Sequence, residues 1–288
     1  MWSNLRSFCL IVSVSFHFGA DKISFIKKIR VLATDLDGTL IPLGNKNEHR
    51  ESMIQLGRLL TTHGVRLWFV TGRSWELTQH AIAQYDLPVA DRVICDVGTR
   101  ILQHRNDRHV EIDDYRSRML EILGNWSAAS IQEKVRELGI PLVLQPPEKQ
   151  TLAKISFDFP HDLFDQVHEG VQDWLSESGA PLSMVTSRCV DTGTGLLDLL
   201  PENVDKSYGL RWLLQQESIA SDELVFAGDS GNDAAVVASG VNTILVGNAD
   251  PQLRSVARAL DRANIFQATS DSTSGVLQGI KHFILSSN

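Results

Sequence analysis

The sequence predicts an α/β fold in which helices flank a buried parallel sheet and a second, smaller unit is inserted into the chain. Short, wholly apolar segments alternate with segments of helical spacing before residue 112 and again after residue 198. Between these parts the expected order changes to α-β-β-α-β-β, and apolar and polar residues alternate along 152–159. Wholly apolar strands are typical of a sheet covered on both faces, and alternation is typical of a sheet with one open face.

Residues 29–111 form the first part of the expected core, in a β-α-β-α-β order. The strands and helices follow one another at 30–34, 51–62, 65–70, 75–84 and 92–95. Because helices join parallel strands in this order, the carboxyl ends of the strands are expected to share one edge of a Rossmann-like sheet.

Residues 112–198 form the expected insert, and residues 199–288 form the second part of the core. In the insert, helices are expected at 114–138 and 162–178, and strands at 142–145, 152–159, 182–186 and 196–200. In the returning core, helices are expected at 207–215, 234–239, 252–263 and 276–285, and strands at 224–227, 243–246 and 265–268. The core is therefore expected to be discontinuous in sequence.

The composition excludes several classes of protein. The formal net charge of -8 disfavours a nucleic-acid partner, because binding to phosphate backbones needs clustered Lys and Arg. Cys9, Cys95 and Cys189 are odd in number and widely spaced, so they predict neither a disulfide framework nor a zinc site. A reducing cytoplasm is the compartment that fits this cysteine usage best.

Residues 1–28 are expected to be an N-terminal extension, disordered or outside the folded domain. An apolar run at 8–18 loosely resembles a secretory signal peptide, which stays the alternative. The run is too short to span a bilayer, so no membrane partner is expected.

Asp35 and Asp37 end the first expected core strand and precede Gly38. Asp-Gly between apolar runs also predicts a simple turn, but carboxylates at the end of a buried strand are costly unless a cation or a reaction compensates them. One carboxylate could attack a phosphoryl group and form an acyl phosphate. The second could protonate the leaving alcohol and later deprotonate the attacking water.

Thr71 and Gly72 end the next expected strand, and Lys206 precedes the helix at 207–215. A threonine hydroxyl and a glycine backbone can approach an anion closely, and a helix N-terminus favours an anion. Each of these signals is weak alone, because many strands end in Thr-Gly and most lysines are solvated surface charges.

The loop that follows another apolar strand contains Asp229 and Asp233. Their carboxylates suit Mg²⁺, although the same loop would also cap the helix that follows. With Asp35 and Asp37 they would bring about four negative charges into one pocket, and Lys206 with one Mg²⁺ would offset roughly three. The remaining charge would be removed if Asp37 were protonated, as a general acid requires.

In their order along the chain, these segments resemble the four motifs of the haloacid dehalogenase (HAD) superfamily over residues 29–285. The residues that carry the resemblance are Asp35-Leu36-Asp37-Gly38-Thr39, Thr71, Lys206 and Gly228-Asp229-x-x-Asn232-Asp233. The αββαββ insert is similar to a C2-type cap. The resemblance therefore implies a HAD core with an inserted α+β cap domain.

The resemblance also implies a role for each residue. Asp35 would be the nucleophile, and Asp37 would be the general acid/base. The phosphate ligands would be Thr71, Gly72 and Lys206. The Mg²⁺ ligands would be Asp35, Asp37 through its backbone carbonyl, Asp229 and Asp233.

Within the superfamily, the chain most resembles sucrose-6-phosphate phosphatases. The supporting segments include Asp96-Val97-Gly98-Thr99, Lys154-Ile155-Ser156, Leu199-Leu200-Pro201 and Ser274-Gly275-Val276. The resemblance implies Mg²⁺-dependent hydrolysis of sucrose 6-phosphate, or of a related disaccharide or hexose phosphate, through an aspartyl-phosphate intermediate. The residues expected to contact the substrate are Arg73, Gln145, Lys154, Ser156 and Asn232.

Gln145, Lys154 and Ser156 fall on the polar side of strands that are otherwise apolar. An open sheet face could lie over the core site and bind sugar hydroxyls, or it could simply be solvated. The first motif ends in Gly38-Thr39, where plant members of the family have other residues. Because cap contacts vary most in such families, the exact sugar depends on the residues of the cap.

Two other functions are compatible with the same residues. A phosphotransferase or phosphomutase would form the same aspartyl phosphate but pass the phosphoryl group to a bound alcohol. A non-catalytic sugar-phosphate-binding module could regulate a sugar-phosphate synthase, which is also a candidate partner of an active enzyme. The presence of all four acidic positions disfavours the non-catalytic module, because buried carboxylates are costly without a use.

Overall fold

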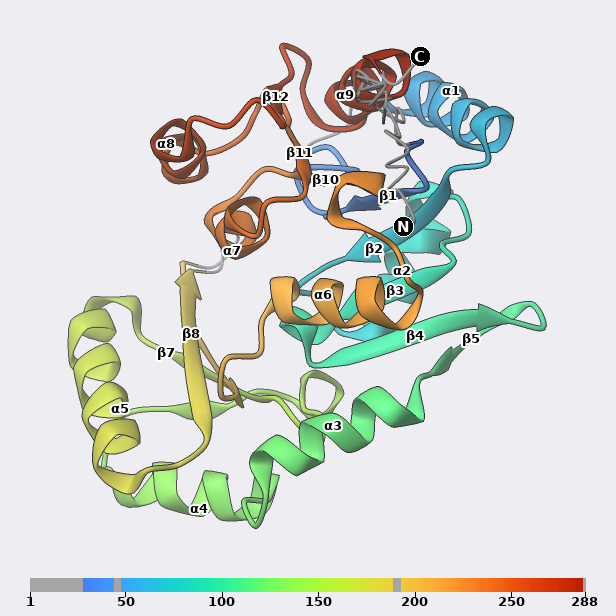
Figure 1. Cartoon of the computed structure of the whole chain (residues 1–288). Helices are drawn as coiled ribbons and strands as arrows, with labels where there is room; N and C mark the ends of the chain where they lie inside the picture. The colour runs from blue at the N-terminus through green and yellow to red at the C-terminus, as the bar shows by residue number, and fades with distance from the viewer. Residues whose placement is uncertain (1–27, 44–47, 189–192, 287–288) are drawn as a thin grey trace, which may run out of the picture.

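A computed structural model describes residues 28–43, 48–188 and 193–286 of the chain (Figure 1). The expected N-terminal extension, apart from Lys28, and its apolar run lie outside the described residues, as do Cys9 and Cys189. None of the helices in the described ranges is long and apolar enough to cross a membrane.

The main sheet has eight strands, and the six at one side of it are parallel. In spatial order the strands are β12 (Ile265–Gln267), β11 (Asn242–Leu245), β10 (Leu224–Gly228), β1 (Val31–Thr34), β2 (Arg66–Val70), β3 (Arg92–Cys95), β4 (Arg100–Arg105) and β5 (Arg108–Glu111). Every predicted core strand is present within a few residues of its expected position. The predicted parallel α/β core is therefore confirmed.

Helices cover both faces of this sheet. Residues of α1 (Glu48–His63), α2 (Trp75–Tyr85) and α9 (Ser272–Ser286) share one buried cluster with the sheet, and α1 and α9 lie side by side in Figure 1. Residues of α6 (Lys206–Gln216) and α7 (Ala234–Ala238) belong to the cluster on the opposite face. The remaining core helix, α8 (Pro251–Leu260), packs mainly on α7 and β11.

The insert is an antiparallel sheet of four strands with helices on one face. The strands in spatial order are β6 (Val143–Leu144), β7 (Ile155–Phe159), β9 (Gly195–Pro201) and β8 (Leu182–Arg188). The helices are α3 (Asp113–Leu123), α4 (Ala128–Glu137) and α5 (Phe164–Ser178). Figure 1 shows the insert as a second layer beneath the main sheet.

Two local features differ from the sequence-based expectation. The helix expected at 114–138 is broken into α3 and α4, because Gly124 ends α3 with φ +58° and the hydroxyl of Ser127 accepts a hydrogen bond from the Ser130 amide to cap α4. The β4–β5 hairpin was not predicted. Asn106 and Asp107 form its turn with φ values of 51° and 57°, which asparagine and aspartate tolerate.

The insert and the core share one cluster of buried apolar side chains. Tyr115 of α3 is fully buried, and its ring lies 4.9 Å from that of Trp212 on α6. The Tyr115 hydroxyl donates a hydrogen bond to the carbonyl oxygen of Gly98, just after β3. Because apolar packing is continuous across the junction, the division at residues 112 and 198 stays a prediction.

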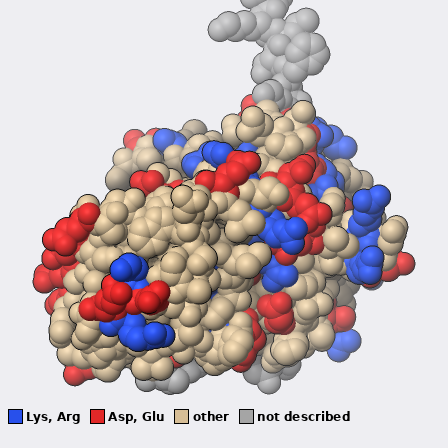
Figure 2. All heavy atoms as spheres, turned by 90° about the horizontal axis from the view of Figure 1, so that it is seen from below, with Lys and Arg blue, Asp and Glu red and all other residues tan. Residues whose placement is uncertain are grey.

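The surface seen from below in Figure 2 carries charges of both signs. Lys and Arg side chains lie interspersed with Asp and Glu, and broad uncharged areas separate these groups. Interspersed charges of this kind do not produce a strong field of one sign on this face.

A substitution at Gly98 tests the packing between the turn after β3 and the start of α6. Its φ is +101°, and a Cβ added there would lie 2.1 Å from the backbone carbonyl oxygen of Asp205. Gly98→Ala is expected to lower the free energy of unfolding by on the order of 3 kcal/mol, because backbone strain and a clash add up. Gly179→Ala is the matched control, since Gly179 has φ +61° and open space around it. The control should cost about 1 kcal/mol in denaturant unfolding, and equal losses would contradict this account.

Candidate active site

Four neighbouring strands of the main sheet deliver polar side chains to one edge. Asp229 and Asp35 directly follow β10 and β1, which pair with each other. Thr71 and Asp96 directly follow β2 and β3, which are the next strands along the sheet. The carboxyl edge of an open parallel sheet is where such folds place their ligands.

Lys206 is the centre of a buried cluster of charges at this edge. Its ammonium nitrogen Nζ lies 3.0 Å from Asp35 Oδ1 and 2.8 Å from Asp233 Oδ1. It also donates a hydrogen bond of 3.0 Å to Asn232 Oδ1. Lys206 is 1% exposed and Asp233 is fully buried, so water screens these interactions little.

Asp229 completes a group of three carboxylates. One oxygen from each of Asp35, Asp229 and Asp233 lies within 4.8 Å of the others. The backbone amides of Asp229 and Ser230 donate hydrogen bonds to Asp233 Oδ2, so both oxygens of Asp233 have protein partners. Asp35 and Asp229 keep oxygen atoms with fewer contacts, which suits them to direct ligation of a cation.

The charge balance of the cluster favours added positive charge. Burial raises the pKa of Asp35 to about 8; Lys206 opposes this rise, and Asp233 and Asp229 add to it. Burial also raises the pKa of Asp229 to about 6, against the hydrogen bond from Thr39. Burial alone would lower the pKa of Lys206, but Asp233 and Asp35 raise it above its usual value. One ammonium group is therefore too little for three carboxylates, and a divalent cation with oxygen ligands fits this donor set.

Gly38 and Thr39 bring the turn after Asp35 against Asp229. Gly38 has φ +77°, and a Cβ added there would lie 2.2 Å from Asp229 Oδ2. The hydroxyl of Thr39 donates a hydrogen bond of 2.7 Å to Asp229 Oδ1. A glycine is required here because only its backbone can approach the carboxylate this closely.

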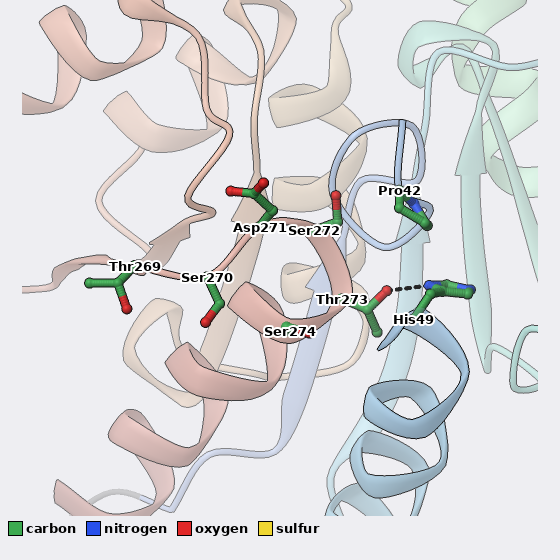
Figure 3. Close-up of a pocket in the computed structure, with 8 residues that line it drawn as sticks. All are labelled: Pro42, His49, Thr269, Ser270, Asp271, Ser272, Thr273 and Ser274. Carbon is green, nitrogen blue, oxygen red and sulfur yellow. Dashed lines mark hydrogen bonds between the residues drawn. The ribbon is translucent and has the colours of Figure 1, made fainter. Parts of the chain in front are cut away.

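The start of α9 braces the same turn. Ser272 Oγ donates to the carbonyl oxygen of Gly38 at 3.0 Å, and Thr273 Oγ1 donates to that of Leu40 at 2.7 Å. Because the Thr273 hydroxyl proton is used in this way, His49 Nδ1 is the donor in the contact of 2.5 Å with Thr273 Oγ1. Figure 3 shows this contact at one side of a pocket of about 310 Å³.

Asp37 lies outside the group of three carboxylates whose oxygens lie within 4.8 Å of one another. Arg73 binds Asp37 with two hydrogen bonds, Nε to Oδ2 at 2.7 Å and Nη2 to Oδ1 at 2.6 Å. Asp37 keeps almost half of its side chain exposed. A guanidinium matches a carboxylate geometrically, so Arg73 supplies the counter-charge that the sequence-based count lacked.

Thr71 and Gly72 lie where the sequence predicts them, at the end of β2. Thr71 is 1% exposed, and its backbone amide donates to the carbonyl oxygen of Ile94 on β3. Its hydroxyl oxygen accepts a hydrogen bond of 3.2 Å from the backbone amide of Arg73. The threonine is therefore fixed at the edge beside Asp35, and its role toward phosphate stays a prediction.

Gln145 and Ser156, which are expected to contact the substrate, are both buried in the structure. Gln145 is 6% exposed and donates a hydrogen bond of 2.7 Å to Asp158 Oδ1. Ser156 is fully buried and donates to Asp198 on the neighbouring strand. The alternation seen in the sequence thus marks polar groups that bind each other inside the insert, which is how buried polar groups are usually satisfied.

Unlike Gln145 and Ser156, Lys154 contacts a residue of the core. Its ammonium nitrogen lies 3.2 Å from Asp96 Oδ1, and the Lys154 and Asp96 side chains are 6% and 0% exposed. Burial raises the pKa of Asp96, and Lys154 opposes that rise. The pair joins the insert to the end of β3.

Asp96 and the pairing of Arg73 with Asp37 were missed as functional features. The sequence contained a signal for Asp96, because it ends an apolar strand in the same way as Asp35 and Asp229 do. No local pattern pairs Arg73 with Asp37, since the two residues meet only through the pairing of β1 with β2.

The parallel α/β fold and the acidic edge of its sheet fit a hydrolase of the HAD superfamily, and more narrowly a phosphatase. A family model described as sucrose-6F-phosphate phosphohydrolase matches residues 28–284. The chain therefore belongs to this family.

Individual relatives agree with this assignment. A HAD-like hydrolase of Nitrosococcus oceani is 33% identical over 270 residues, covering 90% of this chain and 72% of the relative. A mannosylfructose-phosphate phosphatase of Agrobacterium fabrum is 29% identical, covering 90% of this chain and 98% of the relative. Sucrose-phosphatase 1 of Nicotiana tabacum is 27% identical, and the match spans 60% of its length.

A solved structure supports the fold. The sucrose-phosphatase from Synechocystis sp. PCC6803, in complex with sucrose and phosphate, superimposes with a TM-score of 0.71 at 23% identity. The match covers 89% of this chain and 98% of that chain, so it includes both the core and the insert.

The raised pKa values predict how stability depends on pH. Folded Asp35 and Asp229 hold protons that the unfolded chain releases near pH 4. With a chelator present, the free energy of unfolding should therefore fall between pH 5 and pH 8, by up to about 1.4 kcal/mol per pH unit for each proton.

Asp35→Asn should flatten this decline between pH 6 and pH 8, where Asp35 titrates in the folded state and Asp229 has mostly lost its proton. The exposed Asp173 provides the control, and Asp173→Asn should leave the slope unchanged. Denaturant unfolding at several pH values measures both effects. A wild-type protein that gains stability over this range, or an unchanged slope in Asp35→Asn, would contradict the assignment.

Proposed function

We propose that this phosphatase hydrolyses a sugar phosphate in a Mg²⁺-dependent reaction that passes through an aspartyl phosphate on Asp35. The observation that carries the proposal is the buried contact of Lys206 with Asp35 and Asp233 at the strand edge. A carboxylate held beside an ammonium group and two further acids has the surroundings that a nucleophile toward phosphate needs.

Asp35 attacks the phosphorus atom, and the bond to the sugar oxygen breaks. Asp37 gives a proton to that oxygen as the sugar leaves, and it then takes a proton from the water that attacks the aspartyl phosphate. Asp37 is half-exposed and bound by Arg73, so Arg73 must give up at least one of its two hydrogen bonds when Asp37 acts. Arg73 is then free to bind the substrate.

Three residues bind the phosphoryl group that is transferred to Asp35. Lys206 offers its ammonium group, and Thr71 and Gly72 offer the end of β2. Asn232, which is hydrogen-bonded to Lys206, is placed to contact the phosphate or the sugar. Asp35, Asp229, Asp233 and the backbone carbonyl of Asp37 would hold Mg²⁺, which would neutralise the carboxylates and polarise the phosphate oxygens.

The substrate is proposed from the relatives together with the insert. Two of the relatives are named as phosphatases of mannosylfructose phosphate and of sucrose phosphate, which are both disaccharide phosphates. Sucrose 6-phosphate or a related disaccharide or hexose phosphate is therefore our leading substrate class. Lys154 is the insert residue that remains a candidate for sugar binding, because Gln145 and Ser156 are satisfied within the insert.

A sugar-phosphate synthase is a candidate partner. A glucosylglycerol-phosphate synthase of Pseudomonas anguilliseptica is 28% identical over 256 residues, and the match covers 30% of that protein. A segment similar to this chain therefore forms part of that synthase. By analogy, a separate phosphatase could receive its substrate from a synthase bound to it.

Asp35→Asn tests the nucleophile. The substitution should lower kcat by roughly 10⁴-fold or more, because an amide cannot form the acyl phosphate. Phosphate release from the best substrate measures the loss, and circular dichroism shows whether the fold is intact. Asp173→Asn, on the exposed face of α5, should keep wild-type activity. Near-normal turnover in Asp35→Asn would end the assignment.

A substrate panel tests the metal and the sugar together. We expect phosphate release from sucrose 6-phosphate, mannosylfructose phosphate, trehalose 6-phosphate or hexose phosphates only when Mg²⁺ is present, because the carboxylate cluster needs the added charge. Asp229→Asn should require a much higher Mg²⁺ concentration for half-maximal rate. Hydrolysis that persists after complete chelation would contradict the proposal. A rate that rises with added sugar acceptor would indicate phosphoryl transfer instead.

A further inference from the structure

Asp96 and Lys154 form a buried ion pair at the junction of the two sheets. Asp96 directly follows β3 of the main sheet, and Lys154 directly precedes β7 of the insert. The distance from Lys154 Nζ to Asp96 Oδ1 is 3.2 Å, and the two side chains are 6% and 0% exposed. The pair therefore fixes an insert residue to the edge of the sheet that carries the active site.

Two costs indicate that the pair has a use beyond stability. Removing two charges from water costs several kcal/mol for each ion, so a buried pair seldom stabilises a fold more than apolar residues would. The backbone is also strained, because Asp96 and Val97 have φ values of 52° and 58° and are followed by Gly98 at 101°. Consecutive residues in this region tend to occur where a functional group must be placed.

The pair also has unused hydrogen-bonding capacity. In the described parts of the chain, Asp96 Oδ1 accepts no well-oriented hydrogen bond, and Oδ2 receives only a weak contact of 3.6 Å from Cys95 Sγ. Over the same residues, Asp96 is the one polar partner of the Lys154 ammonium group, which has three N–H donors. A buried ammonium with free donors is suited to bind hydroxyl groups.

A chain of contacts links the pair to the proposed general acid. Asp37, the proposed acid for the leaving oxygen, is held by the side chain of Arg73. The backbone carbonyl of Arg73 accepts a hydrogen bond of 2.8 Å from the amide of Asp96. Three contacts therefore link Lys154 to Asp37: Lys154 to Asp96, Asp96 to Arg73, and Arg73 to Asp37.

From these contacts we infer that Asp96 is a positioning residue for sugar recognition. It holds the ammonium group of Lys154 at the sheet junction, where the free N–H groups bind hydroxyls of the substrate beyond its phosphate. The inference rests on the proposed sugar-phosphate phosphatase function. It adds a residue of the core, Asp96, to a recognition step otherwise assigned to the insert.

The first test compares two substrates in the full chain with Mg²⁺. Asp96→Asn should raise KM for the best sugar phosphate about tenfold, because Lys154 is no longer held in place. The same variant should keep kcat and KM within about twofold for p-nitrophenyl phosphate, which has no hydroxyls for Lys154 to bind. A purely structural pair would instead affect both substrates equally, and that result would overturn the inference.

The second test asks whether Asp96 acts through Lys154. Lys154→Met removes the ammonium group but keeps most of the side-chain volume, and the double variant Asp96→Asn/Lys154→Met leaves no buried charge unpaired. If Asp96 acts by positioning Lys154, the double variant should have the same KM for the sugar phosphate as Lys154→Met alone. A KM in the double variant equal to the product of the two single effects would overturn the inference. The double variant also gives this answer if Asp96→Asn alone folds poorly.

Asp91→Asn is the matched control. Asp91 directly precedes β3 and accepts a hydrogen bond from the backbone of Leu67, so it lies at the opposite end of the same strand. Its variant should leave the KM ratio of the two substrates unchanged. If the wild type cleaves p-nitrophenyl phosphate but no sugar phosphate, the proposed function fails and the inference falls with it. If the wild type cleaves a sugar phosphate and Asp96→Asn keeps its KM, only the inference fails.

Discussion

The buried cluster of one ammonium group and three carboxylates is the constraint on which the active edge depends. Lys206 is 1% exposed and touches both Asp35 and Asp233, while Asp229 lies within reach of the same cation position. A group of this kind is unstable in isolation, because burial penalises every charge in it. Its surroundings are therefore built around it: Gly38 leaves room for Asp229, and Thr39 donates a hydrogen bond to it.

The core and the insert meet at the same place. Tyr115 joins the helix α3 to α6 and to the backbone of Gly98, and Lys154 joins the insert to Asp96. These contacts all converge on the segment between β3 and β4, which also touches Arg73 through its backbone. A movement of the insert would consequently displace Arg73, which binds Asp37. The two sheets are thus linked at the end of β3, next to the residue that binds Asp37.

The sequence predicted the parallel sheet and the acids at its edge because both depend on local patterns. A continuous apolar strand followed by a carboxylate marks Asp35 and Asp229 without any knowledge of the fold. The pairing of Arg73 with Asp37, and that of Lys154 with Asp96, depends on which strands become neighbours, and no local pattern states this. The alternation of polar and apolar residues around Ser156 was visible in the sequence. It did not show that the polar side chains form hydrogen bonds with one another.

Proton release on Mg²⁺ binding tests the central claim most directly. Burial raises the pKa of Asp35 to about 8, so at pH 7 a bound cation must displace a proton from the cluster. Isothermal titration of Mg²⁺ in two buffers of different ionisation enthalpy measures this proton count. The account predicts release of a large fraction of one proton in the wild type and much less in Asp35→Asn. Tight Mg²⁺ binding without proton release, or release that is unchanged in Asp35→Asn, would contradict it.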